Sequence, residues 1–421
     1  MIKSIIPDIE AINNLIYIIL VSFPQKAEQI AISGYFDNLD NLITLHQRKQ
    51  SCNTLFINVW EQRKLGDVGS VSMCRRIFKE QTSESGDIPF YKIGTFGGQA
   101  DAYISSELFA EYRSKYPYPK EGDILISASG SIGRTVEFTG KNEYYQDSNI
   151  VWLSHDDRLD NAFLKCFYSV VKWAGIEGST IKRLYNDNIL NTVICMPSVD
   201  EQRKIGTFLK ELDHLITLHQ RKLSKLKNIK KSMLEKMFPQ NSEMRPEIRF
   251  AGFTDDWEQR KLSDIVDSVD TGKSKFDKEG SSGEYPILGS TSVIGYDDEY
   301  DYEGDFILTA RVGANAGNLY RHAGKVKISD NTVFIQTSQN IEFLYQLLMQ
   351  YDVKKLSFGT GQPLVKASEL KSLELMMPKD KKEQMRIGTY LKNLDNLITL
   401  HQRKLEKLGK IKKAMLEKMF V

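Results

Sequence analysis

Eleven residues recur almost letter for letter at three places in this chain. The string LDNLITLHQRK begins at Leu39 and again at Leu394, and LDHLITLHQRK begins at Leu212. The second and third copies belong to a longer match that runs from Glu201 to Phe238 and from Glu383 to Phe420, with a constant offset of 182 residues. A chain that repeats its connecting element while the intervening sequence differs is typical of two variable modules held at a fixed separation.

The apolar residues of the longer match follow a heptad pattern, which predicts a coiled-coil seam. Each copy would form a helix of about 35 residues, roughly 50 Å long. Because a whole module separates the two helices in the chain, we expect them to pair antiparallel with approximate two-fold symmetry and to place the modules at opposite ends. The predicted seam consists of Leu209, Leu212, Ile216, His219 and Leu223 in the first helix and Leu391, Leu394, Ile398, His401 and Leu405 in the second.

Each predicted helix carries a histidine near its middle, His219 in the first and His401 in the second. A histidine inside an apolar seam can be a metal ligand or a catalytic base, but it can also be a structural polar residue. Because both histidines lie near the middle of their helices, we expect them to meet where the helices cross. A hydrogen bond between them would fix the register, as a buried polar residue does in coiled coils.

The first copy of the repeat is shorter than the other two. It keeps Leu39, Ile43 and His46 of the seam but has Gln50 where a seam leucine is expected. We interpret residues 1–50 as the end of a lost upstream module and half of its helix, left by a deletion or a recombination.

A second repeated string, WEQRKL, opens each module at Trp60 and at Trp257. Within the modules, short β-branched runs alternate with glycine-rich turns and short helical segments. The expected fold class is therefore α/β, of the mixed α+β kind. Two globular domains would be joined by the long antiparallel helices. The predicted division is a truncated module end with half a helix at 1–50, a linker at 51–59, the first module at 60–197, the central helix at 198–240, a linker at 241–256, the second module at 257–380 and the C-terminal helix at 381–421.

Charge, cysteine usage and hydropathy narrow the class of protein. The formal net charge is only +2, but the segment 201–238 holds ten Lys and Arg against four Asp and Glu, and 383–420 holds nine against four. The repeated segments are therefore basic.

The cysteines form no C-x-x-C pair and no zinc spacing, so we expect no metal site, no disulfide framework and a reducing cytoplasmic location. The apolar run from Leu15 to Phe23 is too short to cross a bilayer and is read as a buried strand. The cysteines are Cys52, Cys74, Cys166 and Cys195.

The sequence offers little support for catalysis. The string TGKS at Thr271 resembles part of a phosphate-binding loop, but the pattern needs a glycine where the chain has Asp267. No dinucleotide-binding, zinc-protease or serine-hydrolase motif occurs, and no Asn-Pro-Pro-aromatic string of the kind used by amino-methyltransferases is present. We therefore expect a non-catalytic chain without a cofactor of its own.

The modules do carry loops with side chains that suit DNA. A Gly-Asp, an apolar strand and a glycine-rich turn follow Gly122 and Gly304, and each module ends with a loop rich in Gly, Thr and Ser. Lys and Arg neutralise phosphates, Arg forks onto guanine, and Asn or Gln pairs with adenine; the alternative is that the glycines only form turns and the polar residues are solvated. The candidate DNA-binding residues are Ser129, Ser131, Arg134, Lys182 and Arg183 in the first module and Arg311, Asn315, Asn318, Thr360 and Gln362 in the second.

Residues 24–421 resemble the specificity subunit of type I restriction-modification enzymes. The resemblance rests on two dissimilar modules opened by WEQRKL, each closed by a proline and EQ-x-x-IG, and followed by helices with LDxLITLHQRKLxKLxxIKKxMLEKMF. It implies two target-recognition domains that each read one half of a split site in double-stranded DNA. It also implies that the helices are a ruler and a docking surface for two modification (methyltransferase) subunits, which restriction subunits join. S-adenosylmethionine, ATP and Mg would then belong to the partner subunits.

The helix length agrees with that expectation. Modules about 50 Å apart would address half-sites more than one helical turn apart on the duplex, because one turn is about 34 to 36 Å. The extra helix fragment before the first module departs from the usual pattern of the family. Three alternatives therefore stay open: a coiled-coil scaffold that does not read DNA, a rearranged and non-functional specificity subunit, and an enzyme that acts alone.

Overall fold

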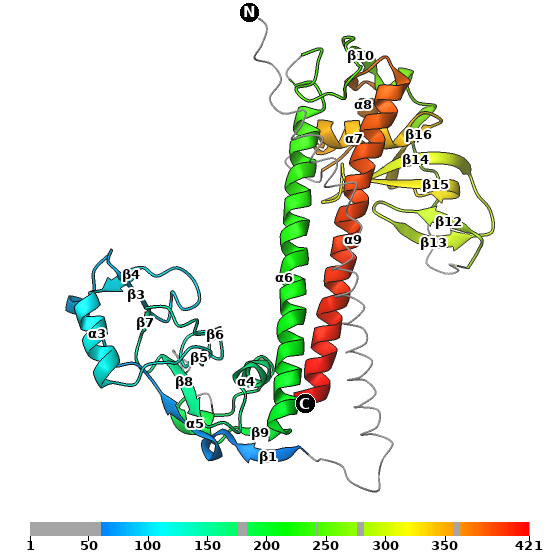
Figure 1. The fold of residues 1–421 in the computed structure, drawn as a ribbon. Coiled ribbons are helices and arrows are strands. Elements are labelled where there is room, and N and C mark those ends of the chain that lie inside the picture. The colour runs from blue at the N-terminus through cyan, green and yellow to red at the C-terminus, as the bar shows by residue number, and fades with distance from the viewer. Residues whose placement is uncertain (1–59, 176–182, 241–242, 276–281, 358–362, 421) are drawn as a thin grey trace, which may run out of the picture. The chain divides into compact units, whose positions relative to one another are not determined.

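The computed structural model describes residues 60–175, 183–240, 243–275, 282–357 and 363–420 (Figure 1). The described residues divide into two compact units, one formed by 60–206 with Phe420 and the other by Thr207–Met419. Helix α6 (Val199–Lys236) begins in the first unit and continues in the second. The predicted buried strand at 15–23, the first copy of the repeat and the linker at 51–59 lie outside the described residues.

In the first unit, the string that opens the module pairs with the strand that closes it. Strand β1 (Glu61–Lys64) runs antiparallel to β9 (Val193–Met196), with Glu61 opposite Met196. The main sheet has four antiparallel strands in the order β2-β8-β5-β6. Its strands are β2 (Gly69–Ser72), β8 (Ile150–His155), β5 (Ile124–Ser127) and β6 (Thr135–Glu137).

A smaller sheet with the order β4-β3-β7 completes the first module around an aromatic core. Phe96, Phe109 and Tyr144 are almost fully buried there. Phe96 and Phe109 meet their ring neighbours edge to face, an arrangement that adds specific ring contacts to the buried area. The elements are β3 (Ile88–Tyr91), β4 (Ala102–Ile104), β7 (Tyr144–Tyr145), the helices α3 (Ser106–Lys115), α4 (Asn161–Tyr168) and α5 (Asn186–Leu190), and the 3-10 turns η1 (Leu65–Asp67) and η2 (Lys79–Gln81).

The second unit contains a module built on the same plan. Strand β10 (Glu258–Lys261), again from WEQRKL, pairs antiparallel with the closing strand β17 (Glu374–Met377). The main sheet has the order β11-β16-β14-β15-β12-β13, in which only β12 and β15 run parallel. Its strands are β11 (Ser268–Thr271), β12 (Tyr285–Leu288), β13 (Val293–Asp297), β14 (Tyr302–Ala310), β15 (Leu319–Ile328) and β16 (Thr332–Thr337), accompanied by α7 (Ile341–Tyr351), α8 (Ala367–Lys371), η3 (Leu262–Asp264) and η4 (Val353–Leu356).

The two repeated helices pair side by side in the second unit (Figure 1). Lys230 of α6 donates to Asp395 of α9 (Lys381–Phe420) at 2.5 Å, and Lys412 of α9 donates to Asp213 of α6 at 2.6 Å. Residue numbers rise along one helix as they fall along the other, so the pairing is antiparallel, as predicted. The two ion pairs also exchange under the repeat offset, which makes the helix pair locally two-fold symmetric.

The two seam histidines lie on that local two-fold axis. The Nδ1 atoms of His219 and His401 are 2.9 Å apart, so one imidazole donates to the other. His219 is buried and His401 is half-buried. This confirms the expectation that the histidines meet at the crossing, where a polar pair within an apolar seam favours one register over others.

Burial of the apolar seam residues is uneven. Leu209, Leu212, Leu391 and Leu394 are at most 1% exposed, whereas the other four apolar residues of the predicted seam are half-buried. Two helices alone cover only one side of each other, so full burial requires a third element. A fully buried leucine contributes about 1.5 to 3 kcal/mol. The half-buried residues are Ile216, Leu223, Ile398 and Leu405.

A tight helix contact explains the glycine of the repeated IG dipeptide. A Cβ on Gly388 of α9 would lie 2.6 Å from the backbone nitrogen of Phe343, in the first turn of α7. In the first unit, a Cβ on Gly206 of α6 would lie 2.6 Å from the Cβ of Ala162 and 2.9 Å from the nitrogen of Phe163 in α4. In each case the long helix approaches the start of a module helix so closely that only glycine fits.

Repeated aromatic residues form the same cluster in both units. Phe238 packs against Trp257 and Phe343 with ring centroids 6.0 Å apart in both contacts. In the first unit, Phe420 takes the place of Phe238 and packs against Trp60 and Phe163 at 6.3 and 5.0 Å. The tryptophan that opens each module and the phenylalanine that ends each MLEKMF string are therefore repeated for packing.

The glutamine of the repeated EQ dipeptide at the start of each long helix is likewise structural, because its side chain bonds back to the proline that closes the module. Gln202 donates to the carbonyl of Pro197 at 3.0 Å, and Gln384 donates to the carbonyl of Pro378 at 2.9 Å. Both glutamines are buried. These hydrogen bonds satisfy amide groups that would otherwise be costly to bury, and they fix the angle at which the chain leaves the module.

Candidate nucleic-acid interface

In the first module, three segments that are distant in sequence meet at the end of strand β5. The nitrogen of Ala128 donates to the carbonyl of Asn149, and the nitrogen of Leu184 donates to the carbonyl of Ala128, both at 2.8 Å. An isolated antiparallel bridge joins Ser129 to Arg183. The glycine-rich turn after β5, the turn before β8 and the segment before α5 thus form one surface, called here the loop edge.

The second module has an equivalent loop edge at the end of β14. The nitrogen of Arg311 donates to the carbonyl of Asn331 at 2.9 Å, and its carbonyl accepts from Val365 at 2.8 Å. Val312 and Leu364 form the matching isolated bridge. Both modules therefore bring the same three kinds of segment together while they present different side chains.

The structure separates the predicted residues of the first loop edge into exposed and buried ones. Ser131 and Arg134 are exposed, whereas Ser129 is buried and its hydroxyl donates to the Asn149 Oδ1 at 2.8 Å. The guanidinium of Arg183 is half-buried over the exposed ring of Tyr185, 5.9 Å from its centroid. Ser129 therefore helps to shape the loop edge, while the other three lie at its surface; the predicted Lys182 is outside the described residues.

The glycine-rich turn of the first module is held rigidly from inside. The Ser127 hydroxyl donates to the carbonyl of Ser131 at 2.5 Å and accepts from the nitrogen of Arg134 at 2.9 Å. Gly133 has φ +83°, and a Cβ there would lie 2.9 Å from the Trp173 Nε1. The turn therefore needs glycine at this position and presents Ser131 and Arg134 from a fixed backbone.

In the second loop edge, the predicted residues are exposed or half-buried and are linked to one another. Arg311 and Asn315 are exposed and Asn318 is half-buried. The side-chain amide of Asn318 donates to the Oδ1 of Asn315 at 3.1 Å, and their backbones are joined by a second bond at 2.9 Å. The remaining candidates, Thr360 and Gln362, lie outside the described residues.

Two asparagines at the loop edges were not among the sequence candidates. Asn149 and Asn331 occupy the turns before β8 and β16, and each accepts a backbone hydrogen bond from the glycine-rich segment. A sequence pattern that could have indicated them is present in the strings DSNIVWL and DNTVFIQ, in which an Asp and an Asn precede a β-branched run. Next to Asn149, Ser148 has φ +52°, a left-handed backbone that costs about 1 to 3 kcal/mol for a residue other than glycine.

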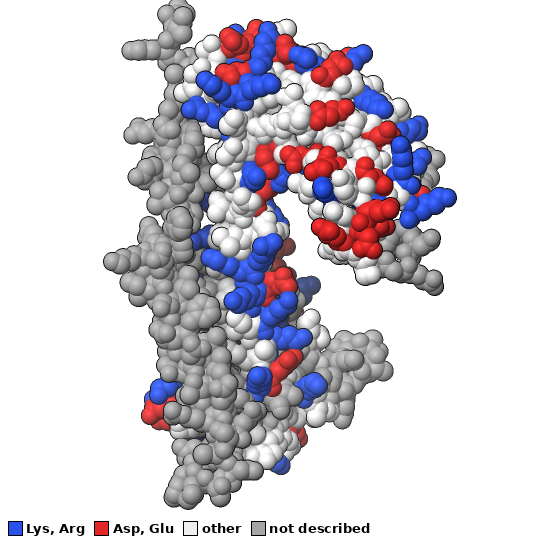
Figure 2. Space-filling view, turned by 90° about the vertical axis from the view of Figure 1, so that its right-hand side faces the viewer, with Lys and Arg blue, Asp and Glu red and all other residues white. Residues whose placement is uncertain are grey.

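Charge is distributed differently over the module and the helices. Acidic and basic side chains are mixed over the second module, whereas Lys and Arg gather along the helix pair (Figure 2). In a hollow of the second module, Lys327 lies 2.9 Å from Asp297, and this ion pair lowers the pKa of the Asp297 carboxyl and raises that of the Lys327 ammonium.

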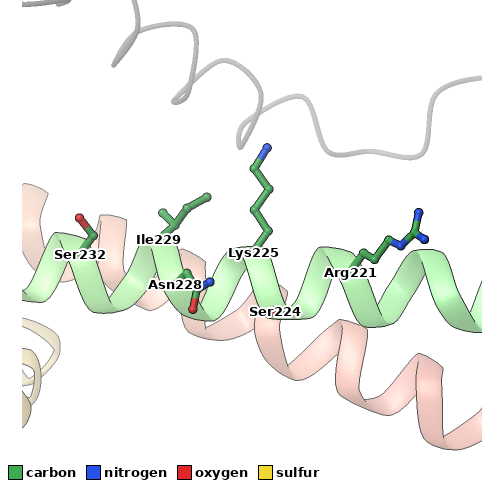
Figure 3. Close-up of a pocket in the computed structure, with 6 residues that line it drawn as sticks. All are labelled: Arg221, Ser224, Lys225, Asn228, Ile229 and Ser232. Atoms are coloured by element: carbon green, nitrogen blue, oxygen red, sulfur yellow. The ribbon is translucent and has the colours of Figure 1, made fainter. Parts of the chain in front are cut away.

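The long helices carry a second surface away from the seam. Arg221 and Lys225 extend from α6 on a different side from α9, beside Asn228 and Ser232 (Figure 3). Apolar residues interleave with these at heptad spacing. They are Leu215, Leu218 and Ile229 on α6, with their repeat counterparts Leu397, Leu400 and Ile411 on α9.

Within the described parts of the chain, no three His, Cys, Asp or Glu side chains form a group that could hold a metal ion. Burial raises the pKa of the Cys74 thiol to about 12, which keeps that residue protonated and unreactive at neutral pH.

Among the helices that the structure describes, none is both long enough and apolar enough to span a membrane.

Comparison with known proteins identifies this arrangement. A putative type I restriction enzyme specificity subunit of Haemophilus influenzae is 58% identical over 163 residues, which are 38% of this chain and 42% of that protein. A type I restriction enzyme specificity subunit of Methanocaldococcus jannaschii is 27% identical over 331 residues, covering 70% of this chain and 74% of that protein. For the first of these relatives, the matched region is less than half of its length.

The fold also matches a solved structure. The crystal structure of a type I restriction-modification system S subunit from M. genitalium superimposes with a TM-score of 0.62 at 18% identity, over 87% of this chain and 98% of that one. Residues 58–228 and 254–410 each match the type I restriction modification DNA specificity domain. The mixed fold predicted from the repeats is confirmed, and the chain belongs to the family of type I restriction-modification DNA specificity domains, of which it carries two.

Proposed function

We propose that this chain is the non-catalytic subunit that selects a bipartite DNA site, with one half read by each module. The observation that carries the proposal is the pair of equivalent loop edges, which share a backbone plan but carry different side chains at equivalent positions, such as Ala128 and Ser129 in the first module against Arg311 and Val312 in the second. A common frame with variable contacts is what two independent half-site readers need. Phosphate contacts from Lys and Arg would position the duplex, and base-edge contacts would specify it.

The second loop edge shows how a base-reading side chain can be prepared. The backbone of Arg311 is fixed on both sides by hydrogen bonds to Asn331 and Val365, and its side chain is exposed. A guanidinium on a fixed backbone can fork onto the O6 and N7 of guanine without a large loss of entropy on binding. The neighbouring Asn315 suits adenine by the same logic.

We further propose that the helices dock two modification subunits, which restriction subunits then join in the cytoplasm. The second apolar surface is repeated on α6 and α9, and Leu400 is 45% exposed. Two equivalent surfaces related by a local two-fold axis suit two copies of the same partner. In this assignment S-adenosylmethionine, ATP and Mg serve the partner subunits.

A module exchange tests the half-site assignment. Residues 60–197 are replaced by the corresponding module of another specificity subunit, and methylated sites are then sequenced in a host that carries the modification subunit. We expect one half of the methylated sequence to change and the other half and their spacing to stay the same. Unchanged methylation would refute the assignment, and a gel shift without sequence preference at fixed salt would favour a scaffold instead.

Substitutions of Arg311 separate base reading from phosphate attraction. We expect Arg311→Ala to weaken binding of the specific duplex by about 1 to 3 kcal/mol, roughly a factor of 5 to 150. Arg311→Lys keeps the charge but not the fork, so it should retain non-specific affinity and lose most of the specificity. Competition binding at several salt concentrations measures both effects, and equal specificity in Arg311→Lys and the unmodified chain would contradict base reading by this residue.

A further inference from the structure

A short segment of the first module carries an exposed aromatic ring among positive charges. It lies between β2 and η2 and has the sequence CRRIFK from Cys74. Cys74 is buried, and Ile77 packs against the same aromatic core of the module. The other four side chains are exposed, and Phe78 is 56% exposed. The exposed set, called here the basic-aromatic turn, consists of Arg75, Arg76, Phe78 and Lys79.

The basic-aromatic turn adjoins the first loop edge. The Nε of Arg76 lies 3.3 Å from the carboxylate of Asp147, and this ion pair leaves 63% of the arginine side chain exposed. The nitrogen of Ser148 donates to the sulfur of Met73 at 3.3 Å, and its carbonyl accepts from Arg183 at 3.4 Å. Arg76 and Arg183 therefore both bind the turn before β8, so the basic-aromatic turn and the loop edge form one continuous surface.

Hydrogen bonds fix the backbone that presents Phe78. The Tyr144 hydroxyl donates to the carbonyl of Arg75 at 3.1 Å. The nitrogen of Phe78 donates to the Gln81 Oε1 at 2.9 Å, and its carbonyl accepts from the nitrogen of Gln81 at 3.0 Å. The side-chain amide of Gln81 donates to the Tyr112 hydroxyl at 3.3 Å. Because this backbone is held on the module, the exposed ring can bind without the entropy cost of ordering a loop.

We propose that Phe78 is an apolar wedge that enters the stack of bases beside the half-site of the first module, while the three cations of the basic-aromatic turn hold the flanking phosphates. Apolar wedges of this kind partly unstack a base step and kink the duplex. Three cations within five residues favour a polyanion as the partner. The inference rests on the proposed function and adds a contact that reads how easily the duplex deforms.

Fluorescence of 2-aminopurine tests the wedge, because unstacking raises it. The probe is the duplex site of this chain with 2-aminopurine at successive positions outside the first half-site, bound by the full chain with its modification subunits. We expect a rise at one flanking position that Phe78→Ala abolishes and Phe78→Leu retains, since leucine is also an apolar wedge. In competition binding, Phe78→Ala should weaken the specific duplex about tenfold and leave the salt dependence unchanged.

Two control substitutions separate the ring from its surroundings. Tyr296→Ala removes an aromatic side chain of similar exposure, 45%, from the second module, where Asp297 and Asp298 follow it. It should leave affinity and fluorescence unchanged at the first half-site. Lys79→Gln keeps the ring and removes one charge, so the slope of log K against log salt should fall by about 1 while the fluorescence rise stays at saturation.

The outcomes separate the wedge from the proposed function. Sequence-specific binding that is equal in Phe78→Ala and the unmodified chain, or a fluorescence rise that persists without the ring, would overturn the wedge and leave the proposed function intact. Weaker binding by Phe78→Ala with no flanking rise in the unmodified chain would also overturn it, because the ring would then only touch the surface of the duplex. If the unmodified chain has no sequence preference, the proposed function fails and the wedge fails with it.

Discussion

Replacing Leu394 by aspartate should separate α9 from α6 and lower the thermal midpoint of the second unit by about 10 °C. Leu394 is a fully buried residue of the seam. Removing a buried leucine costs about 3 to 5 kcal/mol, and a carboxylate in its place adds a desolvation cost. For a unit of this size, each kcal/mol corresponds to about 2 to 4 °C. Calorimetry and circular dichroism on the purified chain measure the shift.

Leu400 provides the matched control on the same helix. It is 45% exposed, so Leu400→Asp should leave the thermal midpoint nearly unchanged. If the second apolar surface docks the modification subunits, the same variant should still weaken their association during gel filtration. A large loss of stability in Leu400→Asp, or a stable helix pair in Leu394→Asp, would contradict the assignment of the two surfaces.

The same substitution at two glycines of α9 should have opposite effects. In Gly388→Ala the new methyl group would lie 2.6 Å from the Phe343 nitrogen, a backbone atom that cannot rotate away. The helix must therefore move off α7, at a cost of about 2 to 3 kcal/mol, as for other overpacked contacts. In denaturant, the unfolding midpoint should fall accordingly.

Gly409 is the control, because no atom lies within 4 Å of the position that its Cβ would take. Alanine is favoured over glycine inside a helix by about 0.5 to 1 kcal/mol, so Gly409→Ala should stabilise the chain by that amount. A shift of the same sign and size in both variants would show that Gly388 serves only helix propensity and not close packing.

The site was predictable in outline but not residue by residue. The glycine-rich turns could be found because glycine and polar residues follow an apolar run, and Arg134 and Arg311 came from those turns, whereas Arg183 came from the loop that closes the first module. Burial of Ser129 depends on Asn149, which is twenty residues away, and no local pattern expresses such a contact. Asn149 and Asn331 were missed for the same reason, since their carbonyls join the loop edge only after the strands are paired.

The sequence by itself determined that two modules alternate with two long helices, that the helices pair antiparallel, and that the histidines meet at their crossing. Heptad spacing and the repetition of a string are properties of the residue order alone, so they can be found without coordinates. Only the tertiary structure decided which distant segments form each loop edge, and why Gly206 and Gly388 must be glycine. Those features depend on strand order and on how closely a long helix approaches a module helix, and both are set by packing between residues far apart in the chain.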